Sequence, residues 1–297
     1  MIEVKGLKKR FGSFDALNGL ELTVPTGAVY GLVGPNGAGK TTAIKHITGI
    51  YRPDGGQVLL DAQPVYENPE AKKRIAYIPD EVYYFAQAGI RDMAAFYRGV
   101  YPSFNEERYR KLGEAFDLDD KAPMKRFSRG MQKQAAFRLA MSLMPEVLIL
   151  DEPVDGLDPV MRRQIWSLLL SDVAERGMTV LVSSHNLREL EDVCDHVGII
   201  HAGRTLVERS LSELQDNMVK VQLVLPEGGA LPQGLNILHE SRTGQVITLI
   251  LRGKAEEIAA KVAAAGPLFY DLLPLTLEEI FIYELGGEHY AVRDVLL

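Results

Sequence analysis

The stretch Gly34-Pro35-Asn36-Gly37-Ala38-Gly39-Lys40-Thr41-Thr42 decides the fold of this chain. It follows an apolar run at 29–33 and precedes a helix-like segment at 41–50. A strand, a glycine-rich loop and a helix in this order are the context that a P-loop requires. The glycines permit positive φ and let backbone N–H groups converge on phosphate oxygens, and the helix N-terminus adds partial positive charge. A plain glycine turn before a helix is the alternative, and the context weighs against it.

The residue types in this loop predict bound Mg-ATP. Lys40 is expected to reach the β and γ phosphates, and the Thr41 hydroxyl is expected to ligate Mg²⁺. We expect the nucleotide to contact the loop and the first helical turn through Gly34, Asn36, Gly37, Ala38, Gly39, Lys40, Thr41 and Thr42.

Two carboxylates follow the apolar run Leu148-Ile149-Leu150, which is typical of a buried strand. Open α/β folds bind ligands at the carboxyl ends of their strands, so we expect Asp151 and Glu152 beside the phosphates. Asp151 is the expected Mg²⁺ anchor, and Glu152 can orient and deprotonate the attacking water. Alone, such a pair would be a helix cap about as often as a catalytic site, but the preceding P-loop favours catalysis.

Periodicity in the first half of the chain predicts an α/β fold with an insertion. Short strands dominate residues 1–80, interrupted by one helix that begins near Gly39, and helical periodicity replaces them over about 81–145. Apolar runs joined to amphipathic stretches return at 147–150 and 178–182, which is the alternation of a parallel sheet.

We therefore expect an α/β P-loop NTPase core over residues 1–215, with a mainly parallel sheet, an N-terminal antiparallel β subdomain and an inserted helical subdomain. After about residue 217 the pattern changes to alternating strands and two helices. This change predicts a small α+β domain over residues 216–297.

The composition excludes several functional classes. A formal net charge of −7 with scattered Lys and Arg argues against nucleic acid as a partner, because that would require a basic footprint. The only cysteine, Cys194, rules out an internal disulfide and a multi-cysteine zinc site, so a reducing cytoplasm is the expected setting. We expect Cys194 to be a small core residue, with a reactive thiol as the alternative. No apolar stretch approaches the roughly 20 residues that cross a bilayer, so another chain would have to span any membrane.

Three further segments point to one family. Phe127-Ser128-Arg129-Gly130-Met131 precedes the acidic strand, Gly156-Leu157-Asp158-Pro159 follows it, and Ser184-His185 ends the next strand. In this order and spacing, residues 1 to about 215 resemble an ATP-binding-cassette (ABC) domain. The resemblance implies an ATPase in which two subunits pair head to tail around two Mg-ATP.

The resemblance also implies roles for single residues. Ser128 and Gly130 would grip the γ-phosphate of ATP bound to the other subunit, and His185 would contact the γ-phosphate as the switch histidine. Residues 156–159 would cross the dimer interface. A Ser before a helix-like run is also a good N-cap, which is the alternative for Ser128. The family usually has Gly and Gln where this chain has Arg129 and Met131, and both changes leave the phosphate-facing pair intact.

The adenine contact is expected in Lys9-Arg10-Phe11-Gly12, which matches the region where the family stacks an aromatic ring on the base. Phe11 can supply that π-face. Core packing is the alternative for Phe11, and Phe14 is the second candidate.

The clearest departure from the family is Asp80, which occupies the position of a usual Gln after Pro79. Asp is shorter than Gln by one methylene, and Mg²⁺ tolerates little geometric error. We therefore expect either that Asp80 binds the metal through water or that Glu81 substitutes. The aromatic residues at 83–85 either line the groove that receives a membrane subunit or belong to the helical subdomain core.

The resulting hypothesis is a transport ATPase, peripheral on the cytoplasmic face of the membrane, that works with a separate membrane-spanning permease. The segment 275–281 is similar to the closing helix of cassettes that work with exporters, and its alternative is an amphipathic helix packing through Leu277, Ile280, Phe281 and Leu285. Two other functions stay open: a cytosolic ABC ATPase acting on DNA or ribosomes, and a regulatory cassette that depends on a more active partner.

Overall fold

The computed structural model describes residues 1–185, 187–216, 218–226 and 228–285. The chain divides into two compact units, one formed by residues 1–185 with 193–208 and the other by residues 186–192 with 209–297. Among the described residues, none of the helices combines the length and the apolar character that crossing a bilayer requires.

The centre of the first unit is a sheet whose described strands have the order β10-β9-β3-β8-β7-β6. Its strands are β3 (Val29–Val33), β6 (Ile75–Ile78), β7 (Val147–Asp151), β8 (Thr179–Ser184), β9 (His196–His201) and β10 (Arg204–Ser210). All pairings from β9 through β6 are parallel. Strands β3, β7 and β8 are buried at every position, as expected for parallel strands covered on both faces.

The register of these strands brings three chain segments to one edge of the sheet. Val33 pairs with Ser184, and Asp151 pairs with Ser183. Because parallel strands point the same way, the segments that follow β3, β7 and β8 leave the sheet side by side. The loop after Val33, the carboxylates after Leu150 and His185 therefore converge.

An antiparallel sheet with the order β2-β1-β4-β5 forms the other layer of this unit. It consists of β1 (Ile2–Phe11), β2 (Phe14–Val24), β4 (Gly55–Leu60) and β5 (Gln63–Pro64). The helix α1 (Lys40–Ile47) contributes Ile44 and Ile47 to a core shared with both sheets. A short helix, α2 (Pro69–Lys73), was not expected from periodicity, although its N-cap Asn68 and its proline at the first position are visible in the sequence.

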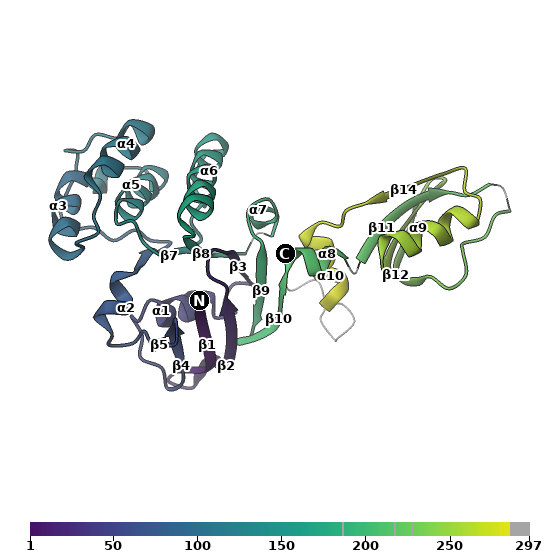
Figure 1. Cartoon of the computed structure of the whole chain (residues 1–297), viewed down its shortest axis with the longest axis horizontal. Helices are drawn as coiled ribbons and strands as arrows, with labels where there is room; N and C mark the ends of the chain where they lie inside the picture. Colours follow the sequence, from purple (N-terminus) through teal and green to yellow (C-terminus); the bar gives the residue numbers. More distant parts are fainter. Residues whose placement is uncertain (186, 217, 227, 286–297) are drawn as a thin grey trace. The chain divides into compact units, whose positions relative to one another are not determined.

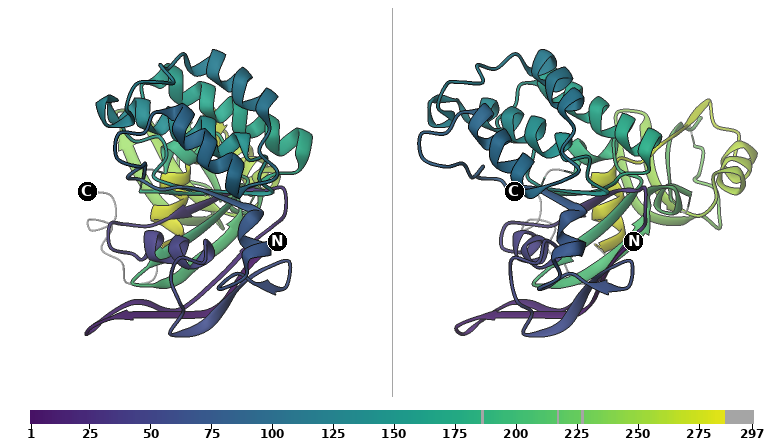
Figure 2. Two further views of the ribbon diagram at one scale, coloured as in Figure 1. Left: turned by 90° about the vertical axis from the view of Figure 1, so that its left-hand side faces the viewer. Right: turned by 60° about the vertical axis from the view of Figure 1, so that its left-hand side comes forward.

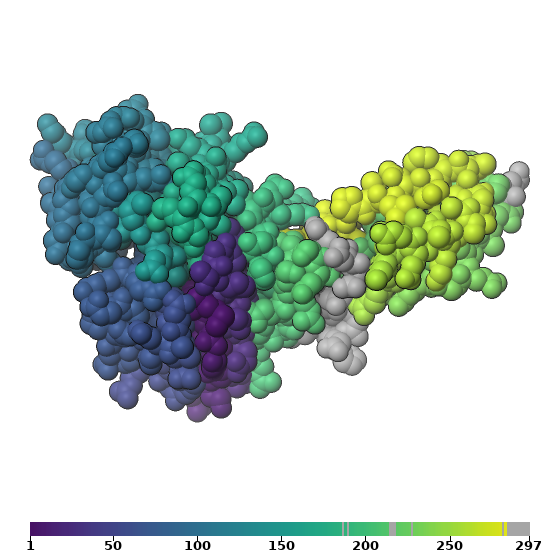
Figure 3. Space-filling view, in the orientation of Figure 1, coloured from purple at the N-terminus to yellow at the C-terminus, as the bar shows by residue number. Residues whose placement is uncertain are grey.

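A helical part protrudes on the opposite side of the central sheet (Figures 1 and 2). It contains α3 (Ile90–Val100), α4 (Glu106–Phe116), the 3₁₀ turn η1 (Met124–Arg126) and α5 (Arg129–Ser142). These elements share a core that includes Ile90, Met93, Tyr109, Met124, Phe127 and Leu139. In Figure 3 this part, coloured blue to teal, and the purple and blue antiparallel part are adjacent masses on the visible face.

Helix α6 (Pro159–Arg176) runs beside the helical part and is joined to it by an ion cluster around the buried Asp172. Asp172 of α6 accepts from Arg108 of α4 at 2.6 Å and from Arg176 at 2.9 Å. Helix α6 begins where the sequence provides an N-cap: the Asp158 side chain accepts hydrogen bonds from the backbone N–H groups of Val160 and Met161.

The second unit is an antiparallel sheet with the order β12-β13-β11-β14, covered by a helix. Its strands are β11 (Met218–Val224), β12 (Asn236–Thr243), β13 (Val246–Arg252) and β14 (Phe269–Leu273). The helix α9 (Ala255–Ala264) packs Ile258 and Val262 on the inward residues of β11 and β13.

Shorter helices complete this unit: α7 (Arg188–Glu191), α8 (Leu211–Asp216) and α10 (Leu277–Leu285). Arg188 of α7 pairs with Glu278 of α10 at 2.9 Å. Leu277 and Ile280 are buried as the amphipathic interpretation of this helix requires, whereas the side chains of Phe281 and Leu285 lie outside the described residues, as does the segment 286–297.

Cys194 is buried, which confirms its prediction as a core residue. Burial raises the pKa of its thiol far above the usual range, with the nearby Asp195 carboxylate acting in the same direction. The reactive thiolate is therefore disfavoured in the folded chain.

Candidate functional site

The glycine-rich loop lies between β3 and α1 in a backbone conformation that its sequence dictates. Gly37 and Gly39 have φ of 82° and 108°, in the region that residues with a side chain rarely adopt. A Cβ added to Gly34 would stand 2.3 Å from the carbonyl oxygen of Ile200, and one added to Gly39 would stand 2.8 Å from that of Ala16. The loop therefore depends on glycine at these positions both for its conformation and for its packing against neighbouring strands.

A cavity of about 300 Å³ lies over this loop. Residues of the loop and of the first turn of α1 line it, joined by four residues from other segments: Phe14, Ala16, Asp80 and Glu152. Gly34 follows the last residue of β3 and is not among the lining residues. The structure thus brings the predicted phosphate-binding residues 35–42 to one concave surface, together with the carboxylate that follows β7.

Lys40 is buried, with 7% of its side chain exposed, and its ammonium has three oxygen neighbours. Nζ donates to the backbone oxygen of Gly34 at 2.6 Å and to that of Pro35 at 3.4 Å. It also lies 3.5 Å from Oε1 of Glu152. A buried ammonium requires such partners because desolvation of an unpaired charge is costly. The ion pair ties the P-loop to the end of β7.

Asp151 and Glu152 are held by one serine on the next strand. Asp151, which is 1% exposed, accepts a hydrogen bond of 2.5 Å from the Ser183 hydroxyl. The backbone N–H of Glu152 donates to the same hydroxyl at 3.2 Å and to the Ser183 carbonyl at 3.3 Å. Ser183 was not singled out from the sequence, where only its place two residues before His185 could have drawn attention to it.

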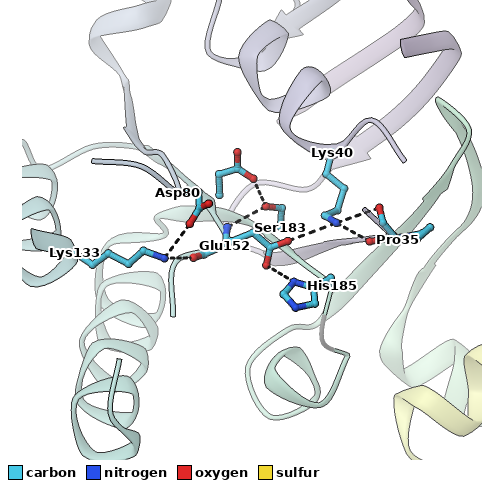
Figure 4. A network of polar contacts seen from close by, with 9 residues as sticks. Pro35, Lys40, Asp80, Lys133, Glu152, Ser183 and His185 are labelled. Carbon is cyan, nitrogen blue, oxygen red and sulfur yellow. Dashed lines mark hydrogen bonds and ion pairs between the residues drawn. The ribbon is translucent and has the colours of Figure 1, made fainter. Parts of the chain in front are cut away.

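The carboxylate of Glu152 lies between a lysine and a histidine (Figure 4). Oε2 is 3.0 Å from Nδ1 of His185, a hydrogen bond in the tautomer that carries the proton on Nδ1. Asp155 completes a group whose potential ligand atoms, one each from Glu152, Asp155 and His185, lie within 4.8 Å of one another. The structure therefore brings Lys40 and His185, predicted from separate motifs, into direct contact with Glu152.

Asp80 lies at the rim of the same cavity, and its nearest charged partner is a lysine. Its Oδ1 is 3.3 Å from Nζ of Lys133, which also donates to the backbone oxygen of Glu152 at 2.5 Å. The sequence alone did not identify Lys133 as a residue of the site. Helix α5 is buried on most of its circumference, so its periodicity does not show which way the lysine points.

Ser128 caps α5, and its hydroxyl accepts from the backbone N–H of Met131 at 3.2 Å. A Cβ added to Gly130 would stand 2.9 Å from the carbonyl oxygen of Gly156, so the two predicted interface segments pack closely together. Neither Ser128 nor Gly130 is among the residues that line the P-loop cavity of this chain. The lining of a second cavity, of about 370 Å³, includes their neighbours Arg129 and Gly156 together with Asp155.

The aromatic residues divide between exposed and packed positions. Phe14, 61% exposed, lines the P-loop cavity, whereas Phe11, 45% exposed, packs edge-on against Tyr51 with ring centroids 5.7 Å apart. Of the aromatic run at 83–85, Tyr84 packs on the helical core. Tyr83 is 73% exposed and makes an edge contact with Phe85, which in turn contacts Phe96.

Tyr77 shows the electrostatic character of this edge of the sheet. Burial raises the pKa of its phenol, and the carboxylates of Asp151 and Asp80 act in the same direction. The phenol therefore stays neutral beside the acidic end of β7.

Comparisons with known proteins agree with this geometry. The family described as ABC transporter matches residues 17–155. ABC transporter ATP-binding protein YtrB of Bacillus subtilis is 29% identical over 97% of this chain and 99% of its own length. Nod factor export ATP-binding protein I of Burkholderia lata is 32% identical over 97% of each chain. A solved structure described as an ATP-binding subunit of an ABC transporter has a TM-score of 0.67 at 28% identity, over 72% of this chain and 92% of that chain.

Proposed function

The chain belongs to the ATP-binding-cassette transporter family and is an ATPase, and from this premise we propose how its residues bind and hydrolyse Mg-ATP. The phosphates of ATP lie over residues 34–42, where backbone N–H groups and the N-terminus of α1 accept negative charge. When ATP binds, the Lys40 ammonium gives up its hydrogen bonds to the backbone oxygens of the loop and donates instead to the β and γ phosphates. Its present oxygen neighbours support this role, because they hold the ammonium at the cavity wall.

The residues present fit Mg²⁺ chemically. Asp151 offers a carboxylate already oriented by Ser183, and Thr41 offers a hydroxyl from the cavity lining, and oxygen donors of these kinds suit a hard cation. Asp80, at the cavity rim, contributes through water, with Lys133 on its Oδ1. When bound, Mg²⁺ neutralises charge on the β and γ phosphates.

Hydrolysis then requires a base and an orienting group. Glu152 accepts a proton from water as the water oxygen attacks the γ-phosphorus, and the bond to the oxygen bridging the β and γ phosphorus atoms breaks to release ADP. His185 holds Oε2 through Nδ1 and presents Nε2, at the other side of its ring, to the γ-phosphate. Lys40 lies 3.5 Å from Oε1 of the same carboxylate, on the side away from His185.

One observation carries this proposal: the Glu152 carboxylate is held by Lys40 of the P-loop at 3.5 Å and by His185 at 3.0 Å, at the edge of the phosphate cavity. A helix-capping role for this carboxylate has no support here, because its described partners are side chains of the site.

The second half of each catalytic site comes from another cassette. Ser128 and Gly130 begin α5 outside this chain's own P-loop cavity, so the N-terminus of α5 grips the γ-phosphate of ATP bound to a partner subunit. Two copies, or two different cassettes, therefore pair head to tail. The adenine stacks on an aromatic ring of the β1–β2 hairpin, for which Phe11 is the family position and Phe14 is the residue that lines the cavity.

A separate membrane-spanning permease docks on the helical part, on the cytoplasmic face of the membrane. The exposed aromatic cluster of Tyr83, Phe85 and Phe96 supports this site, since exposed apolar patches mark interaction surfaces. We assign the direction of transport as export because the relative from Burkholderia lata is named for export and segment 275–281 resembles exporter cassettes.

The deciding experiment is Glu152→Gln, which preserves shape but removes the base. We expect turnover to fall by about 100-fold or more, with ATP still bound and a dimer stabilised in size-exclusion chromatography. The matched control is Glu175→Gln, the same chemical change at an exposed position of α6. Normal turnover in Glu152→Gln would disprove the catalytic assignment. Steady ATPase activity of the purified wild-type chain would exclude a purely regulatory cassette.

A further inference from the structure

Lys133 is a buried cation that none of the motifs accounts for. It belongs to α5, and only 4% of its side chain is exposed. Burying an ammonium costs several kcal/mol unless its protons find acceptors. Its two described acceptors come from different segments, the backbone oxygen of Glu152 at 2.5 Å and Oδ1 of Asp80 at 3.3 Å.

The backbone of Glu152 is strained, and its partners explain how it is kept so. Its φ of 47° lies in the left-handed region, which is unfavourable for a residue with a side chain. Such a conformation persists only where the surroundings fix it. Ser183 fixes the N–H side, and Lys133 fixes the carbonyl side. Figure 4 shows Lys133 reaching Glu152 from the side opposite to Lys40.

The carbonyl contact outweighs the ion pair in this arrangement. Asp80 is 58% exposed, so water screens its attraction to Lys133. The carbonyl contact is also the shorter of the two, 2.5 Å against 3.3 Å. The Glu152 peptide is therefore the principal partner, and Asp80 is the counter-ion that allows the charge to stay buried.

We propose that Lys133 is a positioning residue for ATP hydrolysis: by holding the Glu152 carbonyl, it sets the direction in which the Glu152 carboxylate leaves the backbone. The proposal rests on the proposed role of Glu152 as the base. It does not require Lys133 to touch ATP.

The test compares Lys133→Met with Lys133→Arg in the full-length chain. Methionine matches the apolar stem of lysine but lacks the terminal ammonium and so removes the donor, whereas arginine keeps a cation that can donate to the carbonyl. Misplacing a catalytic group by about 1 Å can cost 100-fold, so we expect kcat to fall about 10- to 100-fold in Lys133→Met. KM for ATP should stay within about twofold, and Lys133→Arg should recover part of kcat. Lys111→Met, at an exposed lysine of α4, is the control.

A double-mutant cycle separates positioning from general destabilisation. If Lys133 acts through Glu152, adding Lys133→Met to Glu152→Gln lowers the residual kcat no further, because residues that act as a unit are non-additive. An additive loss, an unchanged kcat in Lys133→Met, or a loss of ATP affinity would each overturn the proposal. Should Lys133→Met not fold, Lys133→Leu, which also lacks a donor, replaces it in the same comparison.

The proposed function and this inference fail in different ways. Normal turnover in Glu152→Gln alone refutes the base and leaves nothing for Lys133 to position. A deficient Glu152→Gln beside a fully active Lys133→Met refutes only the role of Lys133.

Discussion

Replacing Asp172 with Ala should destabilise the first unit strongly. The carboxylate, 3% exposed, accepts from Arg108 at 2.6 Å and Arg176 at 2.9 Å. Hydrogen bonds to charged groups contribute about 1.5–3 kcal/mol each, so losing both gives an upper bound of about 3–6 kcal/mol. The two arginine side chains are 26% and 25% exposed, and water recovers part of that loss. We therefore expect a decrease of about 2–4 kcal/mol in the free energy of unfolding.

Urea unfolding followed by circular dichroism measures this change, and a thermal melt provides a second reading. For a domain of this size, each kcal/mol shifts Tm by about 2–4 °C, so the melt should fall by about 4–16 °C. Glu175→Gln on the same helix is the control and should change stability by less than about 0.5 kcal/mol. A decrease below about 1 kcal/mol for Asp172→Ala would show that the two arginines find equally good partners in water, and would refute the argument that this cluster ties α4 to α6.

Three further predictions concern the site and its scaffold. Gly34→Ala should reduce ATP affinity by at least about tenfold, measured with a fluorescent ATP analogue, because the new Cβ would stand 2.3 Å from the Ile200 carbonyl oxygen. Gly99→Ala, in the exposed part of α3 with nothing within 4 Å, is its control and should be neutral or stabilising. Ser183→Ala removes a hydrogen bond from Asp151 and should raise the Mg²⁺ concentration for half-maximal ATPase activity about 10- to 100-fold; an unchanged Mg²⁺ titration would argue against Asp151 as the anchor. The hydrogen bonds from the N-terminal ammonium and from Arg74 lower the pKa of Asp61 in the fold, so its stabilisation is present above the unfolded pKa and is lost as the pH falls through the folded value. Asp61→Asn should therefore lower Tm at pH 7 by a small amount, since the pair is half exposed, and the difference from wild type should shrink as the pH falls through the folded pKa of Asp61; a difference that stayed constant with pH would point to another cause.

The family and its core architecture follow from local sequence alone. A strand, the glycine-rich loop and α1 are adjacent in the chain, so the P-loop can be identified from them without reference to distant residues. Parallel strands end at one edge of a sheet, so the sequence also predicts that Asp151, Glu152 and His185 meet the P-loop. The positions at which α5 and α6 begin also depend on residues close in sequence, because the side chains of Ser128 and Asp158 cap these helices.

Only the tertiary structure decided which side chains touch within that site. Lys133 contacts Asp80 across 53 residues, and Ser183 holds Asp151 across 32. Neither pair follows from periodicity, because α5 is buried on most sides and both serines at the end of β8 are buried. The same holds for Phe14, which lines the cavity because of how the β1–β2 hairpin lies beside the P-loop. A site built from residues that are adjacent in the chain can therefore be predicted from the sequence. Contacts between residues far apart in the chain depend on strand register and helix rotation, and these are set by the packing of the whole unit.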